Sequence, residues 1–137
     1  MIKNKSIILI DDSLVRGTTC YKITRMLYEA GAKEVHVRIA CPEILFPDFY
    51  GVDMPTKEEL LAHNKNNDEM CNYINAKSLK FLSLEGLYKA LGCEKRNKEY
   101  PQFSDHYFTG DYPIKPSDLL GKGKVTQLSL LSNKSNN

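Results

Sequence analysis

The sequence predicts an α/β fold in which a parallel sheet is flanked by helices. The run 6–10 is continuously apolar, which is typical of a strand buried on both faces of a parallel sheet. A helical pattern and then an alternating strand follow it, at the spacing of a right-handed βαβ unit. The chain has 137 residues, of which 42% are hydrophobic and 26% charged, so we expect one globular domain with a sizeable core.

The first helix is predicted over residues 18–30, and Gly31 is suited to end it in a left-handed conformation. The next strand is predicted over 34–40, where apolar and polar residues alternate. One face of the helix is apolar and is formed by Ile23, Met26, Leu27 and Ala30.

Residues 41–55 carry three prolines and a glycine and are predicted to form a loop. Thr56 then begins a capping box with Glu59, which predicts a short helix through Ala62. A polar break is expected over 63–67.

A further helix is predicted from its cap at Asp68 through Asn75. A third strand is predicted over 79–82, followed by a helix that begins at Ser83 and runs through Leu91.

The remaining sequence is polar and aromatic with little periodicity, which predicts an irregular C-terminal segment. We expect one domain over residues 1–116. Residues 117–137 are rich in Lys, Ser and Asn and are expected to form a polar tail that is disordered at its end.

Charge and hydropathy exclude several classes of protein. With 19 basic and 17 acidic residues the net charge is +2, which is too balanced to indicate binding to nucleic acid or to an anionic membrane. No apolar run approaches the ~20 residues of a membrane span. The first residues make a poor signal peptide, so a cytoplasmic location is expected. The four cysteines and three histidines lack metal-site spacing, and we expect free thiols.

Two adjacent carboxylates, Asp11 and Asp12, directly follow the apolar run. Ligands of parallel α/β sheets bind beyond the carboxyl ends of the strands, so both side chains are expected at a binding site. Their oxygens suit Mg²⁺ or the hydroxyl groups of a sugar. A simpler interpretation also stands at this point, in which both side chains only cap the next turn.

The loop 13–19 leads from these carboxylates into the first predicted helix. Free N–H groups and the positive dipole end of a helix favour an anion such as phosphate. Gly17 allows the backbone to approach the anion, and the Thr18 and Thr19 hydroxyls can donate hydrogen bonds. Arg16 adds positive charge nearby. A phosphorylated ribose that carries a metal-bound pyrophosphate would match both the loop and the carboxylates.

Residues 11–19, Asp-Asp-Ser-Leu-Val-Arg-Gly-Thr-Thr, resemble the phosphoribosyl pyrophosphate (PRPP) signature of type I phosphoribosyltransferases, in the version of the amidophosphoribosyltransferase family. The likeness spans roughly residues 5–113. Its other segments are 29–40, 49–56, 82–87 and 108–113.

The resemblance implies a partial type I phosphoribosyltransferase fold and a glycosyltransferase activity. It implies that PRPP and glutamine give 5-phosphoribosylamine, the first step of de novo purine synthesis. Asp11 and Asp12 would hold the ribose hydroxyls and Mg²⁺. The resemblance assigns the 5′-phosphate to Ser13, Leu14, Val15, Arg16, Gly17, Thr18 and Thr19. It leaves the catalytic residues unassigned.

The likeness includes neither the glutaminase part of the family nor the first part of the transferase domain. We therefore expect that this chain alone does not complete the reaction. Missing partner strands would leave an edge and an apolar face of the strand 6–10 uncovered. This predicts self-association or pairing with a separately encoded N-terminal piece.

Some members of the family carry an iron–sulfur cluster. By resemblance, its ligand positions fall at or near Asp48, Ser104 and Tyr107 in this sequence. None of these residues is a cysteine, and thiolates are the usual cluster ligands, so we expect no cluster.

Two other functions are compatible with parts of the sequence. The chain could be a non-catalytic module that binds PRPP or a nucleotide. A receiver-type signalling domain would use the same acidic pair together with Asp53 and Lys77. Against a receiver, residues 46–51 make a poor buried strand, and such a domain has no need for the loop 16–19.

Overall fold

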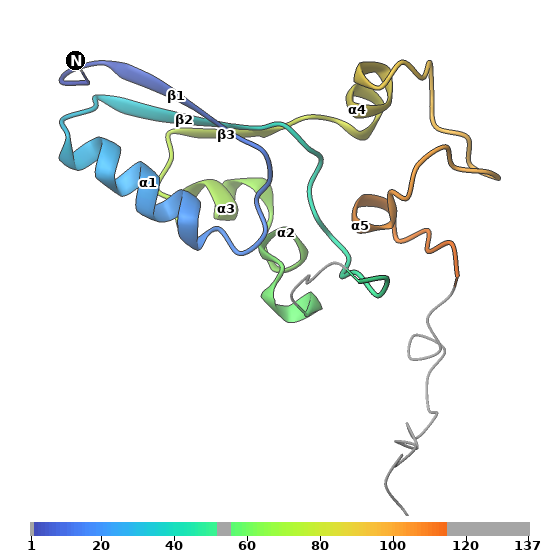
Figure 1. Ribbon diagram of the computed structural model, residues 1–137. Helices are drawn as coiled ribbons and strands as arrows, with labels where there is room; N and C mark the ends of the chain where they lie inside the picture. The colour runs from blue at the N-terminus through green and yellow to red at the C-terminus, as the bar shows by residue number, and fades with distance from the viewer. Residues whose placement is uncertain (1, 52–55, 115–137) are drawn as a thin grey trace, which may run out of the picture.

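The computed structural model describes residues 2–51 and 56–114. Three parallel strands form one sheet in the order β1-β2-β3, which confirms the predicted fold class. Helices α1 and α3 lie together on one face of this sheet (Figure 1). The bounds are Ser6–Asp11 for β1, Glu34–Ile39 for β2, Ser78–Phe81 for β3, Thr18–Glu29 for α1 and Asn67–Tyr73 for α3.

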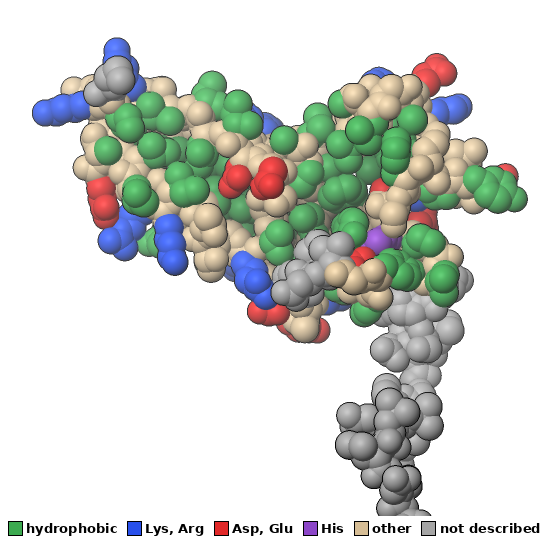
Figure 2. All heavy atoms as spheres, in the orientation of Figure 1, with side chains coloured by type: hydrophobic (Ala, Val, Ile, Leu, Met, Phe, Trp, Pro, Cys, Tyr) green, Lys and Arg blue, Asp and Glu red, His purple; other side chains and the backbone are tan. Residues whose placement is uncertain are grey.

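Strand β2 follows the predicted alternation, because Val35, Val37 and Ile39 are all buried against the helices. Strand β1 does not have the predicted burial on both faces. Ile8 is 65% exposed and Ile10 is 72% exposed, since they point away from the helices and β1 is the edge strand of the described sheet. Hydrophobic side chains are accordingly visible over this part of the surface (Figure 2). Among the residues that the structure describes, the uncovered edge and apolar face expected for this strand are therefore present.

Helix α1 ends at Glu29, one residue before the predicted end, and Gly31 lies in the left-handed region as predicted, at φ 90°. The N–H groups of Gly31 and Ala32 donate to the carbonyls of Tyr28 and Leu27, which satisfies the last turn. Its predicted apolar face is partly wrong, because Met26 is 65% exposed.

The buried positions of α1 are Cys20 and Thr24 instead. The Thr24 hydroxyl is fully buried and lies against the carbonyl oxygens of Tyr21 and Ile74, so a polar side chain is accommodated on the core face.

The segment between β2 and β3 departs most from the prediction. The capping box of Thr56 and Glu59 is present, but the expected helix is divided into a 3₁₀ turn, η1 (Lys57–Glu59), and a short helix, α2 (Leu61–Asn64). Leu60 between them has an extended backbone, with φ −72° and ψ 116°. The polar break predicted over 63–67 is therefore shorter than expected, because α2 extends to Asn64 and α3 begins at Asn67.

Helix α3 is capped by Asn66 rather than by Asp68. The Asn66 side chain accepts from the N–H of Glu69, and the Glu69 carboxylate accepts from the N–H of Asn66. The helix ends at Tyr73, two residues before the predicted end, and Asn75 has a positive φ of 55°. A reciprocal pair satisfies two backbone donors, which a single aspartate at position 68 would not.

Strand β3 lies one residue earlier than predicted, and helix α4 (Leu84–Ala90) is capped by Ser83 as expected. The following segment is irregular apart from a single helical turn, α5 (His106–Thr109). The proposed boundary at residue 116 and the tail 117–137 lie outside the described residues. None of the described helices is long and apolar enough to cross a membrane.

Candidate functional site

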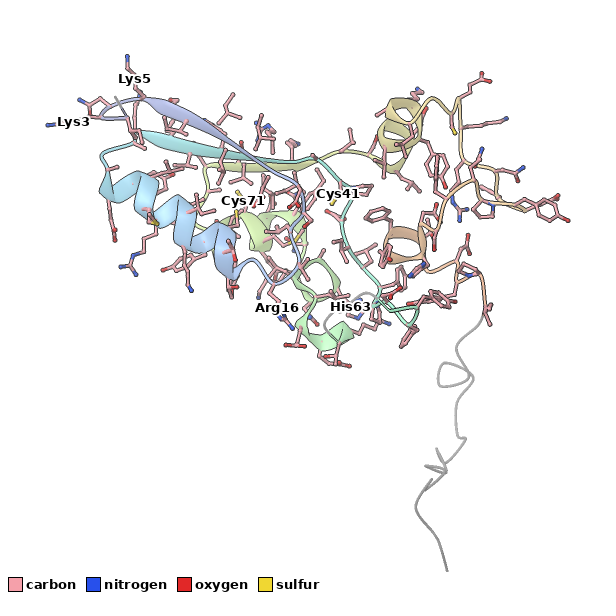
Figure 3. All side chains as sticks on the ribbon, in the orientation of Figure 1. Lys3, Lys5, Arg16, Cys41, His63 and Cys71 are labelled. Carbon is pink, nitrogen blue, oxygen red and sulfur yellow. The ribbon has the colours of Figure 1, made fainter. Side chains whose placement is uncertain are left out.

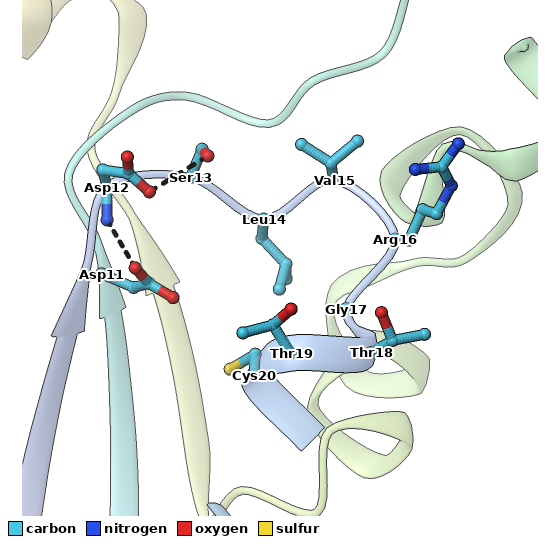
Figure 4. A pocket seen from close by; sticks show the side chains of 10 residues that line it. All are labelled: Asp11, Asp12, Ser13, Leu14, Val15, Arg16, Gly17, Thr18, Thr19 and Cys20. Atoms are coloured by element: carbon cyan, nitrogen blue, oxygen red, sulfur yellow. Dashed lines mark hydrogen bonds between the residues drawn. The ribbon is translucent and has the colours of Figure 1, made fainter. Parts of the chain in front are cut away.

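A pocket opens at the carboxyl end of β1, where the chain turns toward α1 (Figure 4). All nine residues that the sequence predicted for the site line this pocket. They come from one continuous segment, and the tenth lining residue is Cys20, which the prediction did not include. Only the place of Cys20 in the first turn of α1 could have indicated that it lines the pocket. The structure therefore brings the predicted residues together, and their binding roles remain predictions.

The two carboxylates face different parts of the pocket. Asp11 ends β1 and its Oδ1 accepts from the N–H of Asp12 at 3.0 Å. Asp12 in turn accepts a 3.2 Å hydrogen bond from the Ser13 hydroxyl. The negative charge of Asp11 acts on Cys20 in α1, whereas that of Asp12 acts on Cys41 after β2. Successive residues at the end of a strand point to opposite sides, which explains this divergence.

Gly17 provides the turn from the loop into α1. Its φ of 75° lies in the left-handed region, and no side chain caps α1. The N–H groups of the first turn, at Thr18, Thr19 and Cys20, are therefore not used by a capping side chain. They lie at the pocket with the positive end of the helix dipole, which is an arrangement suited to an anion.

Arg16 lines the pocket as expected, but its side chain has a partner that the sequence did not indicate. Its guanidinium forms an ion pair with Glu59, with Nε 3.2 Å from Oε1. Figures 3 and 4 show it at the far end of the loop from the two carboxylates, next to the turn that carries η1 and α2. The sequence could not reveal this pairing, because the two residues are 43 positions apart.

The cysteines near the site are poor nucleophiles. Burial, reinforced by Asp11, raises the pKa of Cys20 to about 11, and burial with Asp12 raises the pKa of Cys41 to about 11. Both thiols are therefore protonated at neutral pH. All four cysteines are free, as predicted.

The described residues contain no cluster of three or more side chains of the metal-binding types. A Mg²⁺ ion at this pocket would thus be held by one or both carboxylates and otherwise by water and ligand oxygens. This donor set is compatible with Mg²⁺, which commonly keeps several waters and binds one or two carboxylates together with substrate phosphates.

The positions that the resemblance assigned to cluster ligands, at or near Asp48, Ser104 and Tyr107, lie around His106. Its Nε2 is 2.7 Å from Oδ1 of Asp48 and its Nδ1 is 3.1 Å from Oγ of Ser104. Tyr107 is next to it, with ring centroids 4.1 Å apart. The histidine is a buried, hydrogen-bonded residue, and the expected absence of an iron–sulfur cluster stays a prediction.

Known proteins match this chain closely over most of its length. The amidophosphoribosyltransferase of Rhizobium etli is 54% identical over 133 residues, which is 96% of this chain and 27% of the relative. The chain is a homologue of the C-terminal part of amidophosphoribosyltransferases. The chloroplastic amidophosphoribosyltransferase 2 of Arabidopsis thaliana is 48% identical, over 86% of this chain and 20% of that protein.

The structures of this family have the same fold. The B. subtilis glutamine PRPP amidotransferase, in complex with ADP and GMP, has a TM-score of 0.75 at 44% identity, over 83% of this chain and 25% of that one. A structure described as the allosteric regulatory enzyme of purine biosynthesis has a TM-score of 0.70. No protein-family profile matches the chain. The chain spans about a quarter of the length of the amidophosphoribosyltransferases that it matches, at 27% of the first.

The receiver interpretation is excluded by the homology and by the sheet. Receivers place the first strand between the second and third, whereas β2 lies between β1 and β3 here. Asp53, which that interpretation needed, lies outside the described residues.

Proposed function

We propose that this amidophosphoribosyltransferase homologue binds PRPP at the pocket beyond β1. The observation that carries the proposal is the continuous lining of the pocket by residues 11–20, which joins two carboxylates to the uncapped first turn of α1. The first turn and the Thr18 and Thr19 hydroxyls bind the 5′-phosphate. Asp11 and Asp12 face the ribose hydroxyls and the Mg²⁺ that accompanies the pyrophosphate.

We propose that the chain contributes to pentosyl transfer from PRPP to the ammonia of glutamine, without completing that reaction alone. Loss of pyrophosphate leaves positive charge on the sugar, which nearby carboxylates stabilise. When bound, Mg²⁺ would neutralise the departing pyrophosphate. The lining of the described pocket comes from a single segment. Further residues of a family-length protein would have to contact the other side of the ligand.

A non-catalytic PRPP- or nucleotide-binding module is the second candidate. It is favoured by the lining itself, which joins an anion-binding turn to two carboxylates that can accept from ribose hydroxyls. Both candidates predict that the chain binds PRPP. They differ in whether synthesis of 5-phosphoribosylamine is restored when the other parts of a family-length protein are added to the chain. We propose a cytoplasmic location for either, consistent with the four free thiols.

Calorimetric titration with PRPP, with and without Mg²⁺, tests the proposed binding. We expect heat that requires Mg²⁺ and that is lost in Asp12→Asn, which keeps the size of the side chain but removes its charge. Asp68→Asn, an exposed carboxylate on α3, is the matched control and should bind as the parent does. Absence of binding by a folded parent protein would contradict the proposal.

We further propose that the uncovered face of β1 is covered by the part of a family-length protein that precedes the matched region. Ile8 and Ile10 present an apolar strip there, next to an open strand edge. Sedimentation of Ile8→Lys/Ile10→Lys tests whether this strip associates. Loss of oligomers in the variant, when the parent forms them, would favour self-association instead. We expect the parent protein to be monomeric and to bind an added N-terminal part of a family protein, and the variant not to bind it.

A further inference from the structure

The loop 13–19 is supported by the segment that runs from η1 to α3. The N–H of Leu61 donates to the carbonyl of Val15 at 2.9 Å. Gly17 packs so closely that a Cβ there would lie 2.7 Å from Cδ2 of Leu61 and 3.0 Å from Cε1 of Tyr73. The ion pair of Arg16 is a third contact with the same segment.

Glu59 is held in place from two directions. Its Oε1 and Oε2 accept from Nε and NH2 of Arg16, at 3.2 and 3.5 Å. Its Oε2 also accepts from the N–H of Thr56 at 3.3 Å, as part of the capping box of η1. The hydrogen bonds from Arg16 lower the pKa of Glu59, so the carboxylate is ionised at neutral pH. The guanidinium is thus bound to a fixed group outside the anion-binding turn.

We propose that Arg16 and Glu59 are positioning residues, whose ion pair fixes the loop and keeps the guanidinium bound to Glu59 rather than to the ligand. The phosphate is then bound by the N–H and hydroxyl groups of residues 17–19 and not by Arg16. This inference rests on the proposed binding of PRPP. It differs from the expectation drawn from the sequence, in which Arg16 supplied positive charge to the phosphate.

The alternative arrangement has Arg16 released from Glu59 and bound directly to the ligand. The two arrangements predict different effects on ligand binding when the charges at positions 16 and 59 are exchanged. A positioning pair works in either polarity, because a carboxylate at position 16 can bind a guanidinium at position 59 across the same gap. The exchange also removes the hydrogen bond from Thr56 to Glu59, and Glu59→Arg alone measures that loss. A phosphate-binding arginine cannot be replaced by a glutamate, which would repel the ligand.

The test compares Arg16→Glu, Glu59→Arg and the double exchange Arg16→Glu/Glu59→Arg by calorimetry with PRPP and Mg²⁺. We expect about a tenfold loss of affinity in Arg16→Glu, and recovery to within about twofold in the double exchange. An exchange that binds as weakly as Arg16→Glu would overturn the proposal. The matched control is Arg25→Glu/Glu29→Arg, an ion pair of α1 with similar exposure, 63% and 60% against 53% and 49%.

Hydrogen exchange at the N–H of Leu61 separates this inference from the proposed function. That group bonds to Val15, so its exchange reports loop position without any ligand. We expect exchange about fivefold faster in Arg16→Glu and parent-like exchange in the double exchange. If the parent does not bind PRPP but this pattern holds, the proposed function fails and the positioning role stands. Unchanged exchange in all variants would overturn the positioning role.

Discussion

Nε2 of His106 lies 2.7 Å from Oδ1 of Asp48, and only 1% and 0% of the two side chains are exposed. This contact joins the segment after β2 to the start of α5, across 58 positions of sequence. The ring also packs against Tyr50, Tyr107 and Tyr112. A buried carboxylate needs such partners, because its desolvation is costly.

Replacing His106 should therefore destabilise the fold strongly. We expect His106→Ala to lower the free energy of unfolding by about 3 kcal/mol, since it removes a buried hydrogen bond to a charged group together with ring packing. Urea unfolding followed by circular dichroism measures this. His63→Ala, at an exposed position in α2, is the control and should change stability by less than about 0.5 kcal/mol. Equal effects of the two substitutions would contradict the burial argument.

Gly17→Ala should destabilise the site for two reasons, backbone strain and a steric collision, which a control variant can separate. A non-glycine residue at φ 75° costs about 1 kcal/mol, and the added Cβ would also collide with Leu61. Gly92→Ala shares the backbone cost, because Gly92 has φ 82°, but has no atom within 4 Å of the added Cβ. We expect Gly17→Ala to lose more thermal stability than Gly92→Ala and also to lose PRPP affinity. Similar melting temperatures for the two variants would show that the packing against Leu61 is unimportant.

Alkylation of Cys20 should be slow at neutral pH and should accelerate about tenfold per pH unit up to its pKa of about 11. Mass spectrometry of iodoacetamide-treated protein resolves the site, with urea-unfolded protein as the reference for full reactivity. Because Cys20 lines the pocket, PRPP with Mg²⁺ should slow its labelling further. Rapid labelling at pH 7 would show that the thiol is neither buried nor influenced by Asp11.

Acid should remove the contribution of Asp105. Burial acts to raise the pKa of this carboxyl, but hydrogen bonds from Arg96 and Tyr88 outweigh it and place the pKa below the usual 3.8. A carboxyl group whose pKa is lower in the folded than in the unfolded state stabilises the fold when the pH lies above the pKa of the unfolded state. This stabilisation is lost as the pH falls through the pKa of the folded state. The pair is held by a 2.5 Å contact from Nε of Arg96 to Oδ2 of Asp105.

Arg96→Gln should thus cost about 3 kcal/mol of unfolding free energy at pH 7 and progressively less below pH ~4. Urea unfolding from pH 7 to pH 3 measures the difference. Lys89→Gln removes an exposed partner of Glu85 and should have a small effect throughout. A cost of Arg96→Gln that is constant with pH would argue against a depressed pKa in Asp105.

The parts of the molecule that the sequence predicted well are those set by neighbouring residues. The alternation in β2, the left-handed Gly31 and the capping box at Thr56 each depend on a few consecutive positions. The candidate pocket was predictable for the same reason, since its lining is one continuous segment. The residue types and their order both lie within this one segment, so no information on tertiary packing was needed to group the residues.

Contacts between distant segments were not predictable from these patterns. The pairing of Arg16 with Glu59 and the burial of Thr24 beneath Ile74 each depend on how separate elements pack. The burial of β1 was misjudged because an apolar run does not reveal whether both faces find partners. The buried face of α1 was misjudged because hydrophobicity alone ranks Met26 above Thr24.

The strand order β1-β2-β3 also has a consequence for how the chain is made. Each strand pairs with the one synthesised just before it, so no strand must wait for a later segment before it can join the sheet. During translation, β1 and β2 can pair as soon as residue 39 has left the ribosome, and α1 is already in place to cover them. The loop that ends β1 is then fixed at both ends while the support from Glu59 and Leu61 is still being translated.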